Sequence, residues 1–211
     1  MPELTFADPS ERDDLGAFVA RAVRLDGQTA VRLRTRDGGR VDAWVATPFD
    51  VLATRTVLGA MEPGDVTVFG NDLLAALAVS RADRVDPGRA VDMQWRSALP
   101  PQAHWQVVEE QLPAKIVSEL TERGLELARE NQGPHGTPPA SLLDQTVLTV
   151  SGDGLEVKIP MRCLFAMSGM GFVGAGDDEH VRVTATDAWL RIDARFGAVV
   201  RRRHALLPLL V

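Results

Sequence analysis

An internal repeat is the feature of this chain that most constrains its fold. Residues 31–57 align without a gap on residues 147–173, at a shift of 116 positions, and six residue pairs are identical. The identical pairs are Val31/Val147, Asp37/Asp153, Gly38/Gly154, Val41/Val157, Phe49/Phe165 and Val57/Val173. Self-similarity at a fixed shift indicates one structural unit that was copied and joined in tandem. We therefore predict two similar units in this chain of 211 residues.

Each copy of the repeat contains a predicted antiparallel hairpin. Residues 29–36 alternate strictly, with Val31 and Leu33 on one side of the chain and arginines on the other. Such alternation is typical of a half-buried strand. A tight turn at Asp37-Gly38-Gly39 and its counterpart at residues 152–154 would close the two hairpins, because glycine readily adopts the positive φ that these turns require. Strands are predicted at residues 41–45, 51–57, 66–69, 146–151, 155–160, 163–173, 180–186, 189–195 and 198–203.

The helix signals lie before the first hairpin and between the two copies. Asp8 followed by Pro9 is typical of a helix start, and this helix is predicted to end near Leu25. Another helix is predicted over residues 113–131, with an apolar stripe of Ile116, Val117, Leu120, Leu125 and Ala128. A short helix is predicted before it at 102–111. Residues 72–81 are rich in leucine and alanine, which favours a helix, but their repeat partner alternates like a strand. Between these alternatives we favour a hairpin over residues 74–95, closed at residues 86–88.

These elements together predict an α+β protein with two tandem, similar units related by a pseudo-twofold internal repeat. Each unit would be an antiparallel sheet packed on a helix. We assign residues 1–100 to the first unit and residues 140–211 to a second, strand-rich unit. Residues 101–139 would connect them through helices and a linker rich in glycine and proline.

The composition narrows the classes of function and the location of the protein. The net charge of −6 argues against general nucleic-acid binding, which usually needs a basic surplus. Cys163 is the only cysteine, which excludes a disulfide within the chain and a zinc site built on cysteines. The first residues do not look like a signal peptide, and no apolar run is long enough to span a membrane. We expect a cytoplasmic protein that does not associate with membranes.

The balance of basic residues points to the source of the chain. It holds 21 arginines and two lysines, no tyrosine, three isoleucines and two asparagines. The residues with AT-rich codons are all scarce together. A high-GC genome explains this pattern better than function does, and we expect an actinobacterial origin.

No pattern in the chain predicts catalysis, a metal site or a cofactor. Cys163 fits a buried strand position better than a nucleophile, since no histidine signature accompanies it. The glycine-rich segment 168–176 lacks the strand-to-helix context of a phosphate loop. Residues 177–180 carry adjacent acids, whereas calcium loops space their acids at alternate positions. We therefore predict no catalytic residue, no metal ligand and no cofactor.

Arginines form the candidate interaction face. Those of the first hairpin share one strand face, and a second group lies near the end of the chain. Tryptophans 44, 95, 105 and 189 could add stacking platforms for single-stranded nucleic acid. The alternatives are a solvated face paired with the chain's own acids, and a contact for an acidic partner. The candidate residues are Arg32, Arg34, Arg36, Arg201, Arg202 and Arg203.

The apolar end of the chain is a candidate contact for self-association. Such a tail seldom stays in water and more often packs on a core or on a second subunit. The candidate residues are Leu206, Leu207, Leu209 and Leu210.

Four short segments of the first unit form a recognisable pattern: Ala30-Val31-Arg32-Leu33, Val41 with Trp44-Val45, Pro48-Phe49-Asp50-Val51-Leu52, and Gly64-Asp65-Val66-Thr67-Val68. They span about 40 residues and contain no catalytic motif. This pattern resembles the SsgA-like proteins of actinobacteria, which regulate sporulation and septum placement. The resemblance implies a whirly-like curved sheet, assembly through strands and helices, and a protein-binding role without catalysis.

We expect a non-catalytic cytoplasmic protein that binds a protein partner, in regulation or cell division, and that self-associates. One alternative is a single-stranded nucleic-acid binder that uses the arginine face. Another is an enzyme or small-ligand binder with a pocket between the two units.

Overall fold

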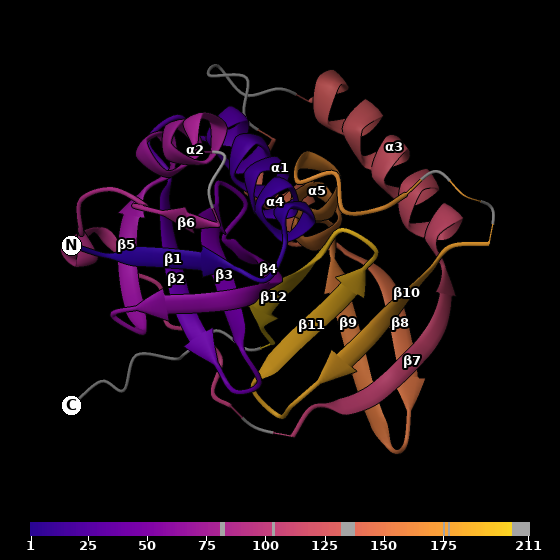
Figure 1. The fold of residues 1–211 in the computed structure, drawn as a ribbon. Helices are drawn as coiled ribbons and strands as arrows, with labels where there is room; N and C mark the ends of the chain where they lie inside the picture. Colours follow the sequence, from indigo (N-terminus) through magenta and orange to yellow (C-terminus); the bar gives the residue numbers. More distant parts are fainter. Residues whose placement is uncertain (81–82, 103, 132–137, 175, 177, 204–211) are drawn as a thin grey trace, which may run out of the picture. The chain divides into compact units, whose positions relative to one another are not determined.

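The computed structural model of the chain describes residues 1–80, 83–102, 104–131, 138–174, 176 and 178–203. The chain divides into two compact units, whose elements are labelled in Figure 1. Unit 1 holds Met1–Leu99 together with Gly169–Gly171. Unit 2 holds Pro100–Ser168 and the residues from Phe172 onward.

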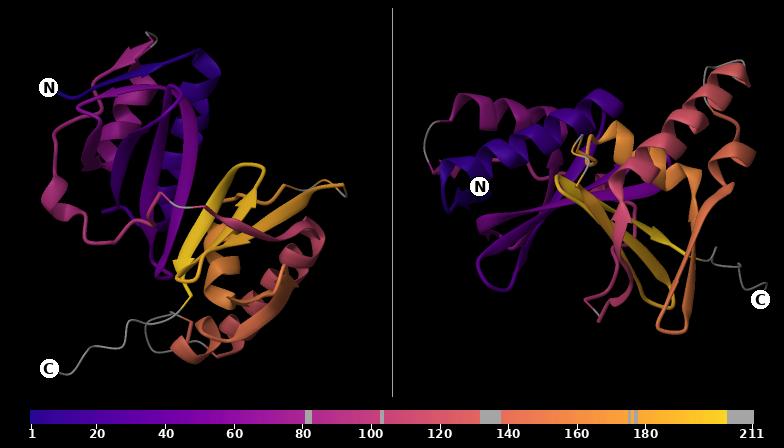
Figure 2. Two further views of the ribbon diagram at one scale, coloured as in Figure 1. Left: turned by 90° about the horizontal axis from the view of Figure 1, so that it is seen from below. Right: turned by 90° about the vertical axis from the view of Figure 1, so that its right-hand side faces the viewer.

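Unit 1 is an antiparallel sheet covered by two helices on one face. Within the unit the strand order is β5-β2-β3-β4-β1-β6. Figure 2 shows α1 and α2 on the same side of this sheet. The elements of the unit are β1 (Glu3–Phe6), α1 (Pro9–Leu25), β2 (Ala30–Arg36), β3 (Arg40–Thr47), β4 (Val51–Glu62), β5 (Asp65–Phe69), α2 (Gly70–Val79), β6 (Arg84–Val85) and the 3-10 helix η1 (Asp92–Gln94).

The buried residues of unit 1 recur with the spacings expected from the sequence, every second residue in the strands and every third or fourth residue in the helix. Alternate residues of β2 and β3 are fully buried, and the arginines of β2 lie on the opposite face. The buried residues of α1 recur at spacings of three and four, which places them on one face of the helix. Asp8 caps this helix by accepting a hydrogen bond from the Ser10 N–H at 2.8 Å. The predicted first helix is confirmed in its cap and in its end.

The described part of unit 2 contains a four-stranded sheet, a separate hairpin and three helices. The strand order of the larger sheet within the unit is β12-β11-β10-β7, and among the described strands β8 pairs only with β9. The elements of the unit are β7 (Gln106–Pro113), α3 (Ala114–Glu130), α4 (Ala140–Leu143), β8 (Thr146–Gly152), β9 (Leu155–Pro160), α5 (Met161–Gly169), β10 (His180–Ala185), β11 (Trp189–Ala194) and β12 (Gly197–Arg202).

The predicted fold class is confirmed: two tandem α+β units, each with antiparallel strands packed on helices. Both units begin with a strand and a helix of 17 residues and then form a hairpin, which in unit 2 follows the short helix α4. Strands β2 and β8 begin at residues 30 and 146, which reproduces the shift of 116 found in the sequence. Residues 26–29 connect α1 to β2, whereas residues 131–145 connect α3 to β8. The second connection is therefore 11 residues longer, 15 against 4. Unit 2 also includes β7 and α3, which we had assigned to the connection between the units.

Three element predictions are wrong. The hairpin predicted over residues 74–95 is instead the helix Gly70–Val79, the two-residue strand β6 and the 3-10 helix Asp92–Gln94. The helix predicted at 102–111 is the strand β7, which pairs with β10. The strand predicted at 163–173 begins as the helix α5.

The first and third of these errors have the same physical cause. In both segments the repeat alignment predicts a strand, whereas the local composition favours a helix. Helix α2 carries leucines at 73 and 77, one turn apart, and both are buried. Helix α5 contains no β-branched residue and is rich in side chains that favour helices.

Candidate functional site

The first group of candidate arginines lies on the sheet face of unit 1 that the helices leave uncovered. Arg32 makes two hydrogen bonds to Asp65 on the neighbouring strand β5, with Nε–Oδ1 and Nη2–Oδ2 distances of 2.8 and 2.7 Å. The hydrogen bonds that Arg32 donates to the Asp65 carboxylate raise the pKa of the Arg32 guanidinium. Arg34 approaches the same carboxylate, with Nε at 3.9 Å from Oδ2. One carboxylate of the chain thus serves two of the three arginines.

The third arginine of β2 pairs with a buried acid. Arg36 Nη1 lies 3.4 Å from Asp42 Oδ2, and the Thr56 hydroxyl donates a hydrogen bond to the other carboxylate oxygen. The Asp42 residue is 9% exposed. Salt bridge and hydroxyl together satisfy a carboxylate that has little contact with water. The arginine face of unit 1 is therefore largely neutralised by the chain's own acids.

Three of the four tryptophans, Trp44, Trp95 and Trp189, are not free stacking platforms for bases, and Trp105 is half-buried. The Arg32 guanidinium lies 5.9 Å from the centre of the Trp95 ring, and the Arg202 guanidinium lies 4.7 Å from that of Trp189. Both distances fit cation–π contacts within the chain. Trp44 and Trp189 are buried.

The second group of candidate arginines lies at the end of β12 in unit 2. Arg203 donates hydrogen bonds to the carbonyl oxygens of Thr186 and Glu156, at 2.9 and 2.6 Å. Arg201 Nη2 lies 3.9 Å from Asp144 Oδ1, a carboxylate that also binds Arg162 of α5. The six arginines therefore belong to two units, and each has partners within the chain. As an interaction face they stay a prediction.

Helix α3 presents an apolar surface that the sequence did not lead us to expect. We predicted an apolar stripe of Ile116, Val117, Leu120, Leu125 and Ala128. The buried stripe consists of smaller side chains: Ala114, Val117, Thr121, Gly124 and Ala128.

Gly124 explains why small residues face inward on α3. A Cβ at this position would lie 2.4 Å from Met161 Cε and 3.1 Å from Phe165 Cε1, both on α5. The absence of a side chain lets α3 lie close to α5. Small residues on one side of the helix, at 114, 121, 124 and 128 with spacings of seven, three and four, were the sequence signal for this close packing.

Larger aliphatic side chains consequently lie on another flank of α3. Ile116, Leu120 and Leu127 share one side of the helix, since they are four and seven residues apart. Ile116 is 38% exposed and Leu127 is 45% exposed. We name these three residues the α3 flank. Exposed glutamates border it at positions 119, 126 and 130.

The other candidate motifs give no catalytic arrangement. Cys163 is buried within α5. Glu179 forms an ion pair with Arg195 at 2.9 Å, and Asp177 lies outside the described residues. Among the residues that the structure describes, no three histidines, cysteines or acids are grouped so as to hold a metal ion. Leu206, Leu207, Leu209 and Leu210 lie outside the described residues, so their role in self-association stays a prediction.

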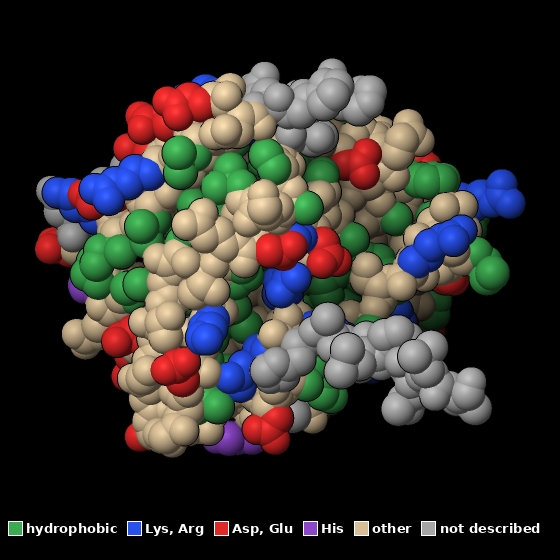
Figure 3. Space-filling model, turned by 180° about the vertical axis from the view of Figure 1, so that it is seen from behind, with side chains coloured by type: hydrophobic (Ala, Val, Ile, Leu, Met, Phe, Trp, Pro, Cys, Tyr) green, Lys and Arg blue, Asp and Glu red, His purple; other side chains and the backbone are tan. Residues whose placement is uncertain are grey.

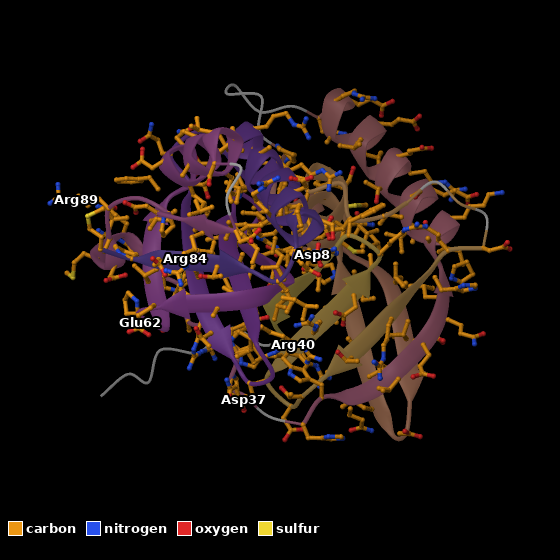
Figure 4. The ribbon with its side chains drawn as sticks, in the orientation of Figure 1. Asp8, Asp37, Arg40, Glu62, Arg84 and Arg89 are labelled. Carbon is orange, nitrogen blue, oxygen red and sulfur yellow. The ribbon has the colours of Figure 1, made fainter. Side chains whose placement is uncertain are left out.

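The face drawn in Figure 3 carries charged side chains of both signs, and basic and acidic side chains lie close together near its centre. At the edge of unit 1, Asp37 and Arg40 flank the turn between β2 and β3 (Figure 4). Arg84 of β6, also labelled there, lies 3.2 Å from Glu3 of β1.

Solved structures with this fold are bacterial DNA sliding clamps. The DNA polymerase sliding clamp of Bacillus subtilis matches with a TM-score of 0.58 and 13% identity, over 99% of this chain and 66% of its own. That of Pseudomonas aeruginosa matches with a TM-score of 0.55 and 12% identity, over 99% and 66%. The Helicobacter pylori beta clamp bound to a DNA ligase peptide matches with a TM-score of 0.54 and 10% identity, over 100% and 67%. The chain thus has a sliding-clamp-like fold and spans about two thirds of the length of these clamps.

Family comparisons divide the chain at nearly the same point as the structure does. Residues 1–97 match the family described as Domain of unknown function (DUF8010). Residues 100–206, more than half of the chain, match Domain of unknown function (DUF8185), and the chain belongs to this family. No curated protein matches the sequence.

These findings overturn the resemblance to the SsgA-like proteins. The structural neighbours are sliding clamps, and the two matched families are different ones. The short similar segments are β2, β3, the start of β4 and β5, whose alternating pattern many half-buried strands share. The whirly-like sheet and the role in sporulation and septum placement have no other support. No described helix is both long and apolar enough to cross a membrane.

Proposed function

We propose that this protein acts without catalysis, as a clamp-fold scaffold that binds other proteins. The fold is that of sliding clamps, and one of those clamps is described in complex with a DNA ligase peptide. The observation that carries the proposal is the α3 flank, where Ile116 and Leu127 are exposed and Leu120 between them is half-buried. Exposed apolar side chains that share a surface typically mark protein contacts. A cytoplasmic location and an actinobacterial origin stay predictions.

The charges around the α3 flank define the chemistry of the partner. Helix α3 carries four glutamates and three basic residues, and Lys115 already lies 4.0 Å from Glu119. The glutamates at 119, 126 and 130 lie beside the apolar residues on one side of the helix, where they outnumber the exposed Arg123 three to one. We therefore assign to this surface an amphipathic protein segment with apolar anchors and a row of lysines or arginines.

Two substitutions test this assignment. Ile116→Glu with Leu127→Glu should leave the fold unchanged, because both side chains are already partly in water, and should abolish binding of the partner. Proteins captured from the source organism by the parent chain, but not by this double variant, would be compared by mass spectrometry. Val79→Glu in unit 1 is the matched control, since Val79 is 83% exposed and lies outside the flank. The proposal would be rejected if the double variant captured the same proteins, in the same amounts, as the parent chain.

A nucleic-acid binder remains the second candidate, because the structural neighbours are DNA polymerase clamps. Salt-sensitive association needs basic residues that are free to replace counterions. The arginines of β2 instead bind Asp65 and Asp42. We therefore expect flat titrations with single-stranded and duplex oligonucleotides at about 50 and about 200 mM salt. Salt-dependent binding that Arg32→Ala with Arg34→Ala abolishes would favour this second candidate. A small-molecule site between the units stays a prediction, open to a thermal-shift screen.

A further inference from the structure

The outer edge of strand β5 is closed by a segment of the same chain. The Thr67 N–H donates a hydrogen bond to Asp92 Oδ1 at 2.7 Å, and the Thr67 carbonyl accepts one from the Val91 N–H at 2.7 Å. We name residues 91–95 the edge cap. An edge strand normally presents such groups to any strand that can pair with them. Here the chain itself occupies them.

The register of β5 shows that Thr67 is the central group of this edge. Gly70 N–H donates to the Thr29 carbonyl and Thr35 N–H donates to the Gly64 carbonyl at the two ends of the β2–β5 pair. Hydrogen-bonded pairs alternate along an antiparallel ladder, so Val66 and Val68 bond to β2. Asp65, Thr67 and Phe69 direct their backbone groups outward. The edge cap holds the middle residue of these three.

Further contacts hold the edge cap in place. Its backbone forms a 3-10 turn, with the Gln94 N–H bonded to the Val91 carbonyl and the Trp95 N–H bonded to the Asp92 carbonyl. Trp95 lies beside the Arg32 guanidinium and donates its indole N–H to the Ser97 carbonyl at 2.6 Å. The charge of Asp92 contributes to the raised pKa of Arg32.

Strand β5 is suited to pair with itself. Its sequence is Asp-Val-Thr-Val-Phe, with Val66 and Val68 placed symmetrically about Thr67. Both valines are buried, on the face opposite the arginines. If two copies paired antiparallel about Thr67, each Val66 would lie opposite a Val68, and the two buried faces would continue into one another. Such a contact uses the same surface on both copies, as twofold dimers do.

We propose that the edge cap blocks an interaction surface for a second copy of this chain, the β5 edge, and that its release allows two chains to join through antiparallel β5 strands. Asp92 and Val91 are the blocking residues, because they occupy the N–H and the carbonyl of Thr67. This inference is independent of the α3 flank and of its partner.

The oligomeric state of full-length variants tests the proposal. Asp92→Ala removes the carboxylate acceptor, and Val91→Pro removes the N–H donor at a residue whose φ of −132° proline does not reach. The double variant should show twice the mass of the parent chain in light scattering after size exclusion, at equal concentration. Asp92→Asn retains an oxygen acceptor and should keep the mass of the parent. Adding Thr67→Pro to the double variant should restore that mass, since it deletes the outward N–H and leaves the pairing with β2 intact.

Two results would overturn the proposal. One is a double variant that keeps the parent's mass at every concentration while its circular dichroism shows an intact fold. The other is a dimer that persists after Thr67→Pro, because that dimer would use another surface.

Amide exchange gives a readout that does not depend on self-association. The Thr67 amide should be protected in the parent, and Asp92→Ala should speed its exchange roughly 10- to 100-fold at concentrations where the chain keeps the parent's mass. Equal exchange rates in the two proteins would mean that the edge cap does not hold β5, and the proposal would fail.

Discussion

Units 1 and 2 begin alike and diverge after their hairpins. Each starts with a strand and a 17-residue helix and then forms a hairpin, but the next element is the strand β4 in unit 1 and the helix α5 in unit 2. Strand β4 pairs with β3 and with β1, so the first hairpin is built into a six-stranded sheet. In unit 2 no described strand pairs with the hairpin β8–β9.

The difference lies in the residues that follow each hairpin. The 12 residues of β4 include two valines and two threonines, which favour extended backbone. The nine residues of α5 include no β-branched side chain. One hairpin sequence pattern can thus be central in a sheet or stand apart from it, depending on whether the next segment can add a strand.

Both units nevertheless use glycine for a close backbone contact with their first strand. A Cβ on Gly59 of β4 would lie 2.2 Å from the Thr5 carbonyl oxygen of β1. A Cβ on Gly152 of β8 would lie 2.3 Å from the Val108 carbonyl oxygen of β7. The contacts are similar, but β4 is hydrogen-bonded to strands on both sides, whereas β9 is the one strand in the described residues that pairs with β8.

Substitution of alanine for each of these two glycines should have the largest effects on stability, and the size of the effect should differ between the two units. We expect Gly59→Ala to lower the free energy of unfolding by about 3 kcal/mol, because β4 cannot move away from β1 without breaking a ladder. Gly152→Ala should cost about 1 kcal/mol, since the hairpin can shift from β7. Urea unfolding monitored by circular dichroism measures both.

Gly16 supplies the matched control for these two substitutions. It lies within α1 with open space around it, so Gly16→Ala should stabilise the chain by about 0.5 to 1 kcal/mol. If Gly152→Ala lowered the free energy of unfolding more than Gly59→Ala does, the hairpin β8–β9 would not be freer to move than β4.

The sequence predicted most where local pattern and repeat agreed. The hairpins, their Asp-Gly turns and the cap of α1 were all visible in the spacing of residues. Errors arose where the repeat was extended past the hairpins. Phe49 and Phe165 are identical in the alignment, yet the first lies between two strands and the second within α5. Whether such a segment becomes a strand depends on the strands available to pair with it, and the spacing of residues within the segment does not reveal these partners.

The candidate site was predicted only in part. Alternation placed Arg32, Arg34 and Arg36 on one face of a strand, as the structure has them. It did not reveal that Asp65 and Asp42 come beside them, because these contacts depend on strand register. The α3 flank was missed for a related reason. The spacing of the aliphatic residues predicts that the leucines of α3 face the core. The close contact with α5 instead admits only small residues such as Gly124.

Loss of one carboxylate should weaken unit 2 more than unit 1. Asp144→Ala removes an acceptor from Arg162, whose side chain is 9% exposed, and we expect a cost of about 2 kcal/mol. Asp65→Ala removes the acceptor of Arg32, whose side chain is 29% exposed, and should cost about 1 kcal/mol because water takes over part of the interaction. Thermal unfolding of the two variants measures the difference. An equal or reversed order would mean that burial of the arginine does not set the cost.

Amide exchange should distinguish the two hairpins in the unmodified chain. The β8–β9 pair has no hydrogen-bonded neighbour among the described strands, whereas β2 and β3 are each paired on both sides. We expect amides of β8 and β9 to exchange roughly tenfold faster than those of β2 and β3. Hydrogen–deuterium exchange read by mass spectrometry resolves the two peptides. Equal protection would indicate that packing compensates for the missing ladder in unit 2.

The smallest expected effect concerns the starts of the two long helices. Asp8 caps α1, whereas Pro113 precedes α3 and gives no side-chain acceptor. The side-chain hydrogen bond from Ser10, together with that from its backbone N–H, lowers the pKa of Asp8 below its ordinary value of 3.8. Because the pKa is lower in the folded state, the contribution to stability is present above pH 3.8 and is lost as the pH falls through the folded value.

Asp8→Ala should therefore lower the urea midpoint at about pH 7, and its difference from the parent should shrink toward about pH 2.5. Asp8→Asn keeps an oxygen acceptor without a titrating group, so its difference from the alanine variant should not shrink in the same way. If the gap between parent and Asp8→Ala stayed constant down to the lowest pH, the ionised cap would not be what distinguishes the start of α1 from that of α3.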